Sequence, residues 1–168
     1  MRKMVCLLVV IVVASGFAAS ALPGYPYPSV WGTVVSVIDG NQIVIEIVGA
    51  SDPAWIVGSE ETVRYIGSCA DPTTATVCGA IATQVNYQMV FGRLVYLEFD
   101  EQLRDVDGAV LAYVYLDGGG FSMVNAALVA LGLAKATDVA PNQRYSQVFL
   151  GLEQAASQLG LGCLATQH

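Results

Sequence analysis

The chain has 168 residues, of which 55% are hydrophobic and 12% are charged, and its 7 basic and 14 acidic residues give a formal charge of −7. This length fits one ordinary globular domain with a proper core. The acidic balance disfavours tight, nonspecific binding of DNA or RNA, because proteins that bind polyanions usually concentrate Lys and Arg on one face.

The first 21 residues have the features of a secretory signal peptide. Arg2 and Lys3 precede the apolar run Val5–Val13, and small residues ending in Ala19-Ser20-Ala21 follow it. We therefore predict cleavage after Ala21 and export to the exterior, the periplasm or the cell envelope. The alternative is an uncleaved anchor, but the run is short for a membrane span, and we expect the mature chain not to span a membrane. Cleavage leaves about 147 residues, with 5 basic against 14 acidic ones and a formal charge of −9.

The rest of the chain divides into a lead-in, one domain and a short tail. Residues 22–30 form a Pro/Tyr-rich lead-in, since each proline disfavours helix at the residue before it. Residues 31–164 form the predicted domain, and residues 165–168 form the tail.

Hydrophobic periodicity predicts the elements of the domain. The expected strands cover 33–38 and 42–48, joined as a hairpin at Asp39-Gly40-Asn41, and then 61–66, 93–99 and 110–116. The expected helices cover 79–91, 123–131 and 141–159, the last beginning at Pro141. The first helix should bury a face of Ile81, Ala82, Val85 and Met89. This order predicts an α+β fold, a five-stranded OB-type β-barrel with three helices.

Five segments in order then resemble the staphylococcal-nuclease-like (thermonuclease) family, between about Thr33 and Leu164. The segments are Val37–Asn41 (V-I-D-G-N), Val63–Gly67 (V-R-Y-I-G), Cys78–Ala82 (C-G-A-I-A), Gly108–Val114 (G-A-V-L-A-Y-V) and Val124–Ala134 (V-N-A-A-L-V-A-L-G-L-A). The resemblance implies a phosphodiesterase that uses Ca²⁺, with two aspartates on the metal, two arginines on the phosphate and a glutamate that orients the attacking water. Hard Ca²⁺ prefers anionic oxygens, and charge developing at phosphorus is stabilised by bidentate cations.

Only part of this catalytic set is present at the matching positions. Arg64 occupies the place of the strand arginine, where it can hold a phosphate or, alternatively, form a strand-end ion pair. Asp39 keeps the first acid of the hairpin, but Asn41 replaces the metal aspartate two positions on. An amide gives Ca²⁺ one neutral oxygen, and Asn41 is also an ordinary turn residue.

The remaining catalytic positions are substituted. Without gaps, Cys69 takes the place of the second metal aspartate and Pro72 that of the glutamate. A frame shifted by two residues makes Asp71 a metal ligand, but it then places Thr73 or Thr74 where the glutamate is needed. Ala109 replaces the second arginine.

The charged residues near Ala109 are interpreted as solvated surface charges. Arg104, five residues before Ala109, is interpreted as a solvated loop charge. The acids Asp100, Glu101, Asp105 and Asp107 are likewise interpreted as a solvated acidic loop, because their spacing matches no EF-hand.

Three cysteines remain after processing, namely Cys69, Cys78 and Cys163. Export favours one disulfide, and the odd count leaves one thiol over. A Cys69–Cys78 bond would close a short loop, whereas a Cys78–Cys163 bond would tie the first helix to the C-terminal end. Zinc is disfavoured, because the only histidine is His168 and no C-x-x-C occurs.

These observations predict an exported domain that has lost hydrolysis and acts as a binding module for an extracellular protein or an envelope ligand, such as a peptidoglycan or sugar fragment. The alternative is a weak Ca²⁺-dependent nuclease that uses Arg64, Asp39, Asn41 and Asp71. A third interpretation is a structural cell-surface module without ligand or activity. The binding interpretation requires no cofactor, and the nuclease alternative requires Ca²⁺.

Overall fold

The computed structural model describes residues 30–73, 75–138 and 140–163. The predicted signal peptide, the lead-in before Val30, Thr74 and the C-terminal tail lie outside these residues.

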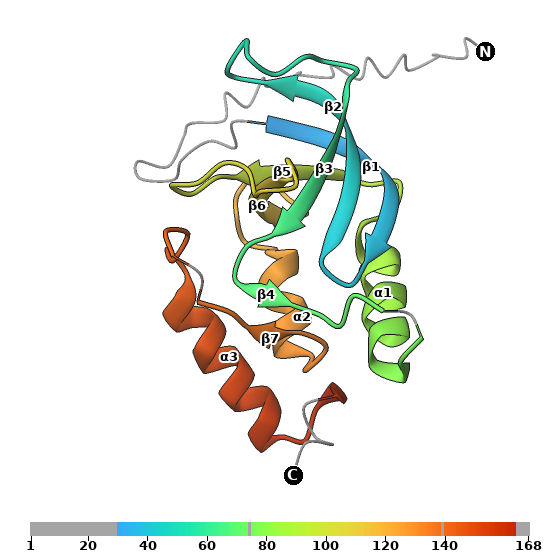
Figure 1. The fold of residues 1–168 in the computed structure, drawn as a ribbon, viewed down its shortest axis with the longest axis vertical. Helices are drawn as coiled ribbons and strands as arrows, with labels where there is room; N and C mark the ends of the chain where they lie inside the picture. Colours follow the sequence, from blue (N-terminus) through green and yellow to red (C-terminus); the bar gives the residue numbers. More distant parts are fainter. Residues whose placement is uncertain (1–29, 74, 139, 164–168) are drawn as a thin grey trace, which may run out of the picture.

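Five strands close into a barrel, as the sequence predicts (Figure 1). They are β1 (Val30–Asp39), β2 (Gln42–Ala50), β3 (Glu60–Tyr65), β5 (Leu94–Glu98) and β6 (Val110–Tyr115). The order around the barrel is β1-β2-β3-β6-β5. Neighbouring strands are antiparallel except β3 and β6, which pair in parallel with Arg64 opposite Leu111. The predicted OB-type α+β class is therefore confirmed.

The first hairpin shows how the sequence builds the barrel wall. Along β2, Ile43, Ile45 and Ile47 alternate with more exposed residues and fill the barrel interior. The hairpin turn contains Gly40, and a Cβ atom there would lie 2.5 Å from the Cβ of Ala70 and 2.8 Å from that of Ala82. The turn therefore needs glycine, because it packs directly onto the first helix.

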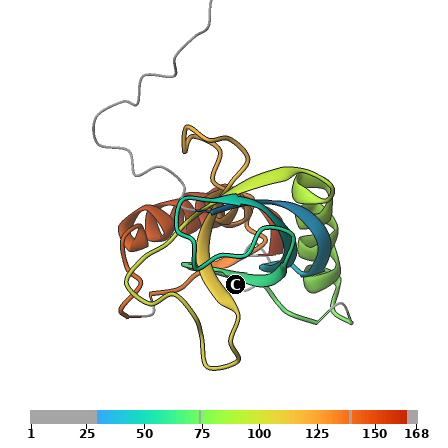
Figure 2. The same ribbon diagram turned by 90° about the horizontal axis from the view of Figure 1, so that it is seen from above.

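The three helices are α1 (Val77–Val90), α2 (Val124–Ala130) and α3 (Ser146–Gln158). Of these, α1 lies beside the barrel, and α2 and α3 lie below it in the view of Figure 1; Figure 2 shows the same arrangement from above. Helix α1 packs on β1, and α2 packs between β6 and α3. The predicted inner face of α1 was wrong at Ile81, whose side chain is exposed. The predicted Ala82 is buried, and the predicted Val85 and Met89 pack partly buried against the core. Gly79, Asn86 and Val90 complete the buried face.

The start predicted for the last helix, at Pro141, was also wrong. Asn142 accepts a hydrogen bond from the backbone N–H of Gln102 (2.7 Å) and donates one to its carbonyl (2.8 Å). These contacts hold the segment before α3 against the loop after β5, so the helix begins only at Ser146. Two further short strands, β4 (Ser68–Cys69) and β7 (Lys135–Ala136), pair beneath the barrel and escape periodicity analysis because each has two residues.

One buried amide fastens the parallel strand pair to α2. Asn125, which is fully buried, donates to the carbonyls of Ile66 (2.9 Å) and Ala112 (3.1 Å) and accepts from the N–H of Val114 (2.9 Å). An amide that satisfies three buried backbone groups is costly to remove. It fixes the end of β3 relative to β6.

The disulfide joins Cys78 at the start of α1 to Cys163 near the C-terminal end. Cys69 is exposed and is the free thiol among the described cysteines. The Cys78–Cys163 alternative is therefore the one that the structure shows. Across the described residues, no helix combines the length and the apolar character that crossing a membrane requires.

We predict that replacing both Cys78 and Cys163 with serine lowers the free energy of unfolding by about 2–5 kcal/mol, because the bond closes a long loop. Equilibrium denaturation in urea measures this loss. Cys69→Ser serves as the control and should leave the unfolding midpoint unchanged. Equal stability of the double variant and the parent would contradict the prediction.

Candidate functional site

The candidate site lies where β3 ends beside the loop between β5 and β6. Arg64 is near the end of β3, opposite Gln42 on β2 and Leu111 on β6. The parallel pairing places Leu111 beside Arg64, and the loop before β6 turns back on itself so that Asp105 reaches Arg64. Arg64 therefore faces a segment some forty residues further along the chain.

Arg64 forms an ion pair with the acids of that loop. Its Nη1 lies 2.5 Å from Asp105 Oδ2, a charge contact without the alignment of a hydrogen bond, and 3.6 Å from Asp107 Oδ2. Of the two interpretations of Arg64, the structure therefore shows the ion pair. The prediction of a wholly solvated acidic loop was wrong for Asp105, whose side chain is largely buried.

The hairpin residues of the family motif lie close to Arg64, but their side chains form hydrogen bonds with backbone groups of the turn and of β4. The Asp39 carboxylate accepts the N–H of Asn41 (2.8 Å), and the Asn41 amide donates to the Ser68 carbonyl (3.3 Å). Asn86 of α1 donates to the Asp39 carbonyl (2.9 Å) and accepts from the Tyr65 hydroxyl (2.9 Å). Burial raises the pKa of the Tyr65 phenol, so this group stays a neutral donor.

Asp71 anchors a different turn, the one that leads into α1. Its carboxylate accepts the hydroxyl of Thr76 (2.6 Å) and the N–H of Thr73 (3.0 Å). These bonds, the one from Thr76 first, lower the pKa of Asp71 below its ordinary value. Thr76 in turn caps the helix by accepting the N–H of Gly79 (3.0 Å). Asp71 is not among the residues that line the cavity beside Arg64.

The residues present do not fit Ca²⁺. One of the three candidate ligands, Asn41, is an amide, and another, Asp71, is held by its own turn. Within residues 30–73, 75–138 and 140–163 there is no group of three or more His, Cys, Asp or Glu side chains able to hold a metal ion. Ca²⁺ prefers several anionic oxygens converging on one point, so we derive no catalytic step through a metal.

The other substituted positions carry no replacement chemistry. Cys69 is exposed at the end of β4, and Pro72 is exposed in the following loop. Ala109 is buried, and its N–H donates to Asp105 Oδ1 (3.0 Å). The position of the family's second arginine therefore contributes only a backbone donor that holds Asp105.

Arg104 is exposed and lies outside the cavity lining, in keeping with a loop charge, but it has partners that the sequence did not reveal. Its guanidinium forms a bidentate pair with Glu61 (2.8 and 2.9 Å) and lies 5.5 Å from the ring centre of Trp55. Asp100 is not solvated, because it accepts the hydroxyl of Tyr113 (2.9 Å) and the N–H of Arg144 (3.0 Å). Arg104 therefore braces β3 against the loop and does not reach the site.

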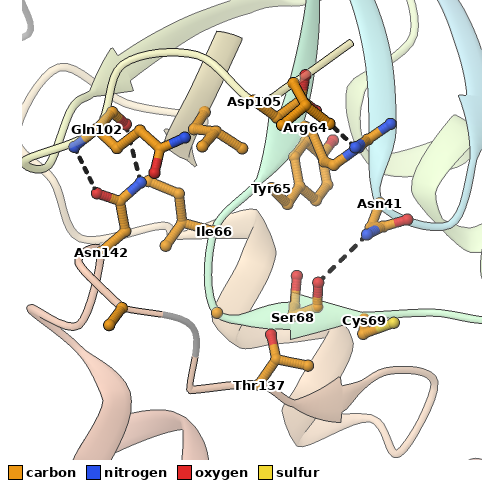
Figure 3. A pocket seen from close by; sticks show the side chains of 14 residues that line it. Asn41, Arg64, Tyr65, Ile66, Ser68, Cys69, Gln102, Asp105, Thr137 and Asn142 are labelled. Atoms are coloured by element: carbon orange, nitrogen blue, oxygen red, sulfur yellow. Dashed lines mark hydrogen bonds and ion pairs between the residues drawn. The ribbon is translucent and has the colours of Figure 1, made fainter. Parts of the chain in front are cut away.

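A cavity of about 350 Å³ opens beside Arg64. Figure 3 shows Arg64 and Asp105 together at one end, Gln102 and Asn142 at another, and Ser68 and Thr137 along the floor. Apolar side chains complete the wall: Ile66, Val106, Leu111 and Ala140. The Ser68 hydroxyl is buried and has no hydrogen-bond partner among the described residues. The size and mixed lining suit a small molecule or a side chain of a partner.

Sequence reasoning missed the residues that shape this cavity. Asp105 was grouped with solvated acids, and neither Ser68 nor the Gln102–Asn142 pair was recognised. Asp105 carried one usable signal, because the sequence Asp-Val-Asp-Gly favours a turn in which the first aspartate bonds to backbone N–H groups. Ser68 and Asn142 carried none, since their roles depend on contacts between distant segments.

Comparison with known proteins gives the same family as the motifs. The staphylococcal nuclease homologue family model matches residues 63–163. The thermonuclease of Staphylococcus hyicus is 32% identical over 127 residues, covering 74% of this chain and 68% of the relative. The thermonuclease of Staphylococcus intermedius is 32% identical over 114 residues (67% and 62%), and endonuclease YncB of Bacillus subtilis (strain 168) is 34% identical over 128 (74% and 56%). The chain therefore belongs to the staphylococcal nuclease homologue family, and it spans between about half and two thirds of the length of these relatives.

We predict that Asp71 is a turn residue with a depressed pKa. Removing the Thr76 hydroxyl with Thr76→Val should raise the pKa of Asp71 toward its ordinary value of about 3.9, whereas Thr76→Ser, which keeps the hydroxyl, should leave it low. A carbon-detected NMR titration of the carboxyl group measures both. A shift of the Asp71 signal on addition of millimolar Ca²⁺ would contradict this role and support metal binding.

Proposed function

We propose that this chain is a member of the nuclease family that has lost hydrolysis and binds a ligand in the cavity beside Arg64. The observation that carries the proposal is the Arg64–Asp105 ion pair. Arg64 is the one cation of the family's active-site set still in place, and Asp105 already pairs with it. Asn41, Cys69 and Ala109 supply neither a metal acid nor a second arginine. Single charge-stabilising groups are typically worth roughly 10²–10³ in rate, although such losses need not add.

The ligand in this proposal is an extracellular protein or an envelope component. Thr137 and the Gln102–Asn142 pair, which line the cavity, support an uncharged, hydrogen-bonding ligand. Export is part of the same proposal: it rests on the basic and apolar N-terminal segment, and the Cys78–Cys163 disulfide is compatible with an oxidising compartment.

A second candidate is weak nuclease activity. It is favoured by the relatives, which are named thermonucleases and an endonuclease. It is also favoured by the place of Arg64 at the cavity wall. This candidate requires Ca²⁺ to bind through Asp39 and Asn41 with a weaker donor set than the family uses.

We predict no cleavage of fluorescently labelled single-stranded DNA by the full-length protein at high concentration in millimolar Ca²⁺. The thermonuclease of Staphylococcus hyicus serves as the positive control under the same conditions. Cleavage that EDTA abolishes and that Arg64→Ala also abolishes would refute the loss of hydrolysis and establish the nuclease. Cleavage that survives Arg64→Ala would indicate a contaminating enzyme.

The binding role has its own test. Soluble peptidoglycan fragments, titrated into isotopically labelled protein, should shift the NMR signals of Ser68, Thr137 and Leu111. Shifts confined to residues outside the cavity would overturn the assignment of the cavity as the binding site.

A further inference from the structure

At the end of the cavity that contains Arg64, acidic side chains outnumber basic ones. Arg64 is the only basic residue among the described residues that line it. Asp105 and Asp107 both approach the same Nη1 atom, at 2.5 and 3.6 Å (Figure 3 shows Asp105 beside Arg64). A phosphate entering this end of the cavity would meet one cation already accompanied by two carboxylates.

Asp105 is held in place by its own turn, independently of Arg64. Its Oδ1 accepts the N–H groups of Asp107 (2.9 Å) and Ala109 (3.0 Å), which leaves Oδ2 directed at the guanidinium. Its side chain is 13% exposed, whereas that of Asp107 is 71% exposed. Solvent screens an exposed carboxylate much more than a buried one. Asp105 therefore dominates the field at Arg64, and Asp107 adds a smaller contribution.

We propose that Asp105 is a specificity-determining residue that occupies Arg64 and excludes phosphate and other small anions from the cavity. The carboxylate takes the position that a phosphate oxygen would need at Nη1, and the backbone donors of residues 107 and 109 keep it there. The cavity consequently disfavours anionic ligands. This inference concerns the same cavity as the proposed binding role, and it rests on the proposed loss of hydrolysis.

The test is a titration of the full-length protein with inorganic phosphate, followed by the NMR signals of Arg64 and its neighbours. The wild-type protein should show no saturable shift up to tens of millimolar phosphate. Asp105→Asn should bind phosphate at least about tenfold more tightly. The amide of Asn keeps an oxygen for the two backbone N–H groups while removing the charge, so the turn is preserved.

Three further variants separate this mechanism from a general charge effect. Arg64→Ala combined with Asp105→Asn should abolish the gain, because the anion binds to Arg64. Asp107→Asn should give a smaller gain, in keeping with its longer distance and greater exposure. Asp52→Asn is the matched control. Asp52 lies in the loop before β3, away from Arg64, and its carboxylate also accepts a backbone N–H two residues further on. Removing its charge should leave phosphate binding unchanged.

Several results would overturn the proposal. Wild-type protein that binds phosphate as tightly as Asp105→Asn would show that Asp105 excludes nothing. A gain that persists in the double variant, or that Asp52→Asn reproduces, would place the anion elsewhere. If Asp105→Asn fails to fold, two other variants test the proposal: Asp105→Ser, which keeps a short acceptor, and the surface variant Asp107→Asn. No gain in phosphate affinity in either variant would refute the proposal. DNA cleavage by the wild-type protein that Arg64→Ala abolishes would refute both proposals, because it requires a phosphodiester at Arg64, whereas saturable phosphate binding without DNA cleavage would refute this one alone.

Discussion

The parallel contact between β3 and β6 is the constraint on which the site depends. It brings the first half of β6 alongside the end of β3, and Asn125 fixes this arrangement by bonding to backbone groups of both segments. Without this register, Asp105 would not lie beside Arg64, and the loop after β5 would not line one side of the cavity. The chemistry of the site is therefore a consequence of how two distant strands are clamped together.

Three of the few basic residues form ion pairs within the domain. Arg64 pairs with Asp105, Arg104 with Glu61, and Arg144 with Glu98, whose carboxylate also accepts the hydroxyl of Tyr115. In a chain with twice as many acids as bases, each of these ion pairs consumes a cation that a polyanion would otherwise use. The acidic composition and the local geometry thus act in the same direction, and both leave these three cations paired with carboxylates.

The sequence predicted the elements well where local pattern decides structure, and poorly where distant contacts do. Alternation along residues 42–48 and the turn at Gly40 are local signals, and the barrel strands formed as predicted. The late start of α3 depends on the bonds between Asn142 and Gln102, which no local pattern encodes. The partners of Arg104 and Asp105 were missed for the same reason, since they come from β3.

The substitution at position 109 and the ion pair at position 105 are physically linked. Asp105 lies in a turn whose backbone donors include the N–H of Ala109, so its carboxylate is presented to whichever cation is near. An arginine at position 109, as in the family motif, would offer Asp105 a second partner and leave Arg64 less committed. With alanine there, Arg64 is the cation that the structure places against this largely buried carboxylate, and pairing with it offsets part of the desolvation cost. The pairing of Arg64 with Asp105 is therefore tied to position 109 through the turn that holds Asp105.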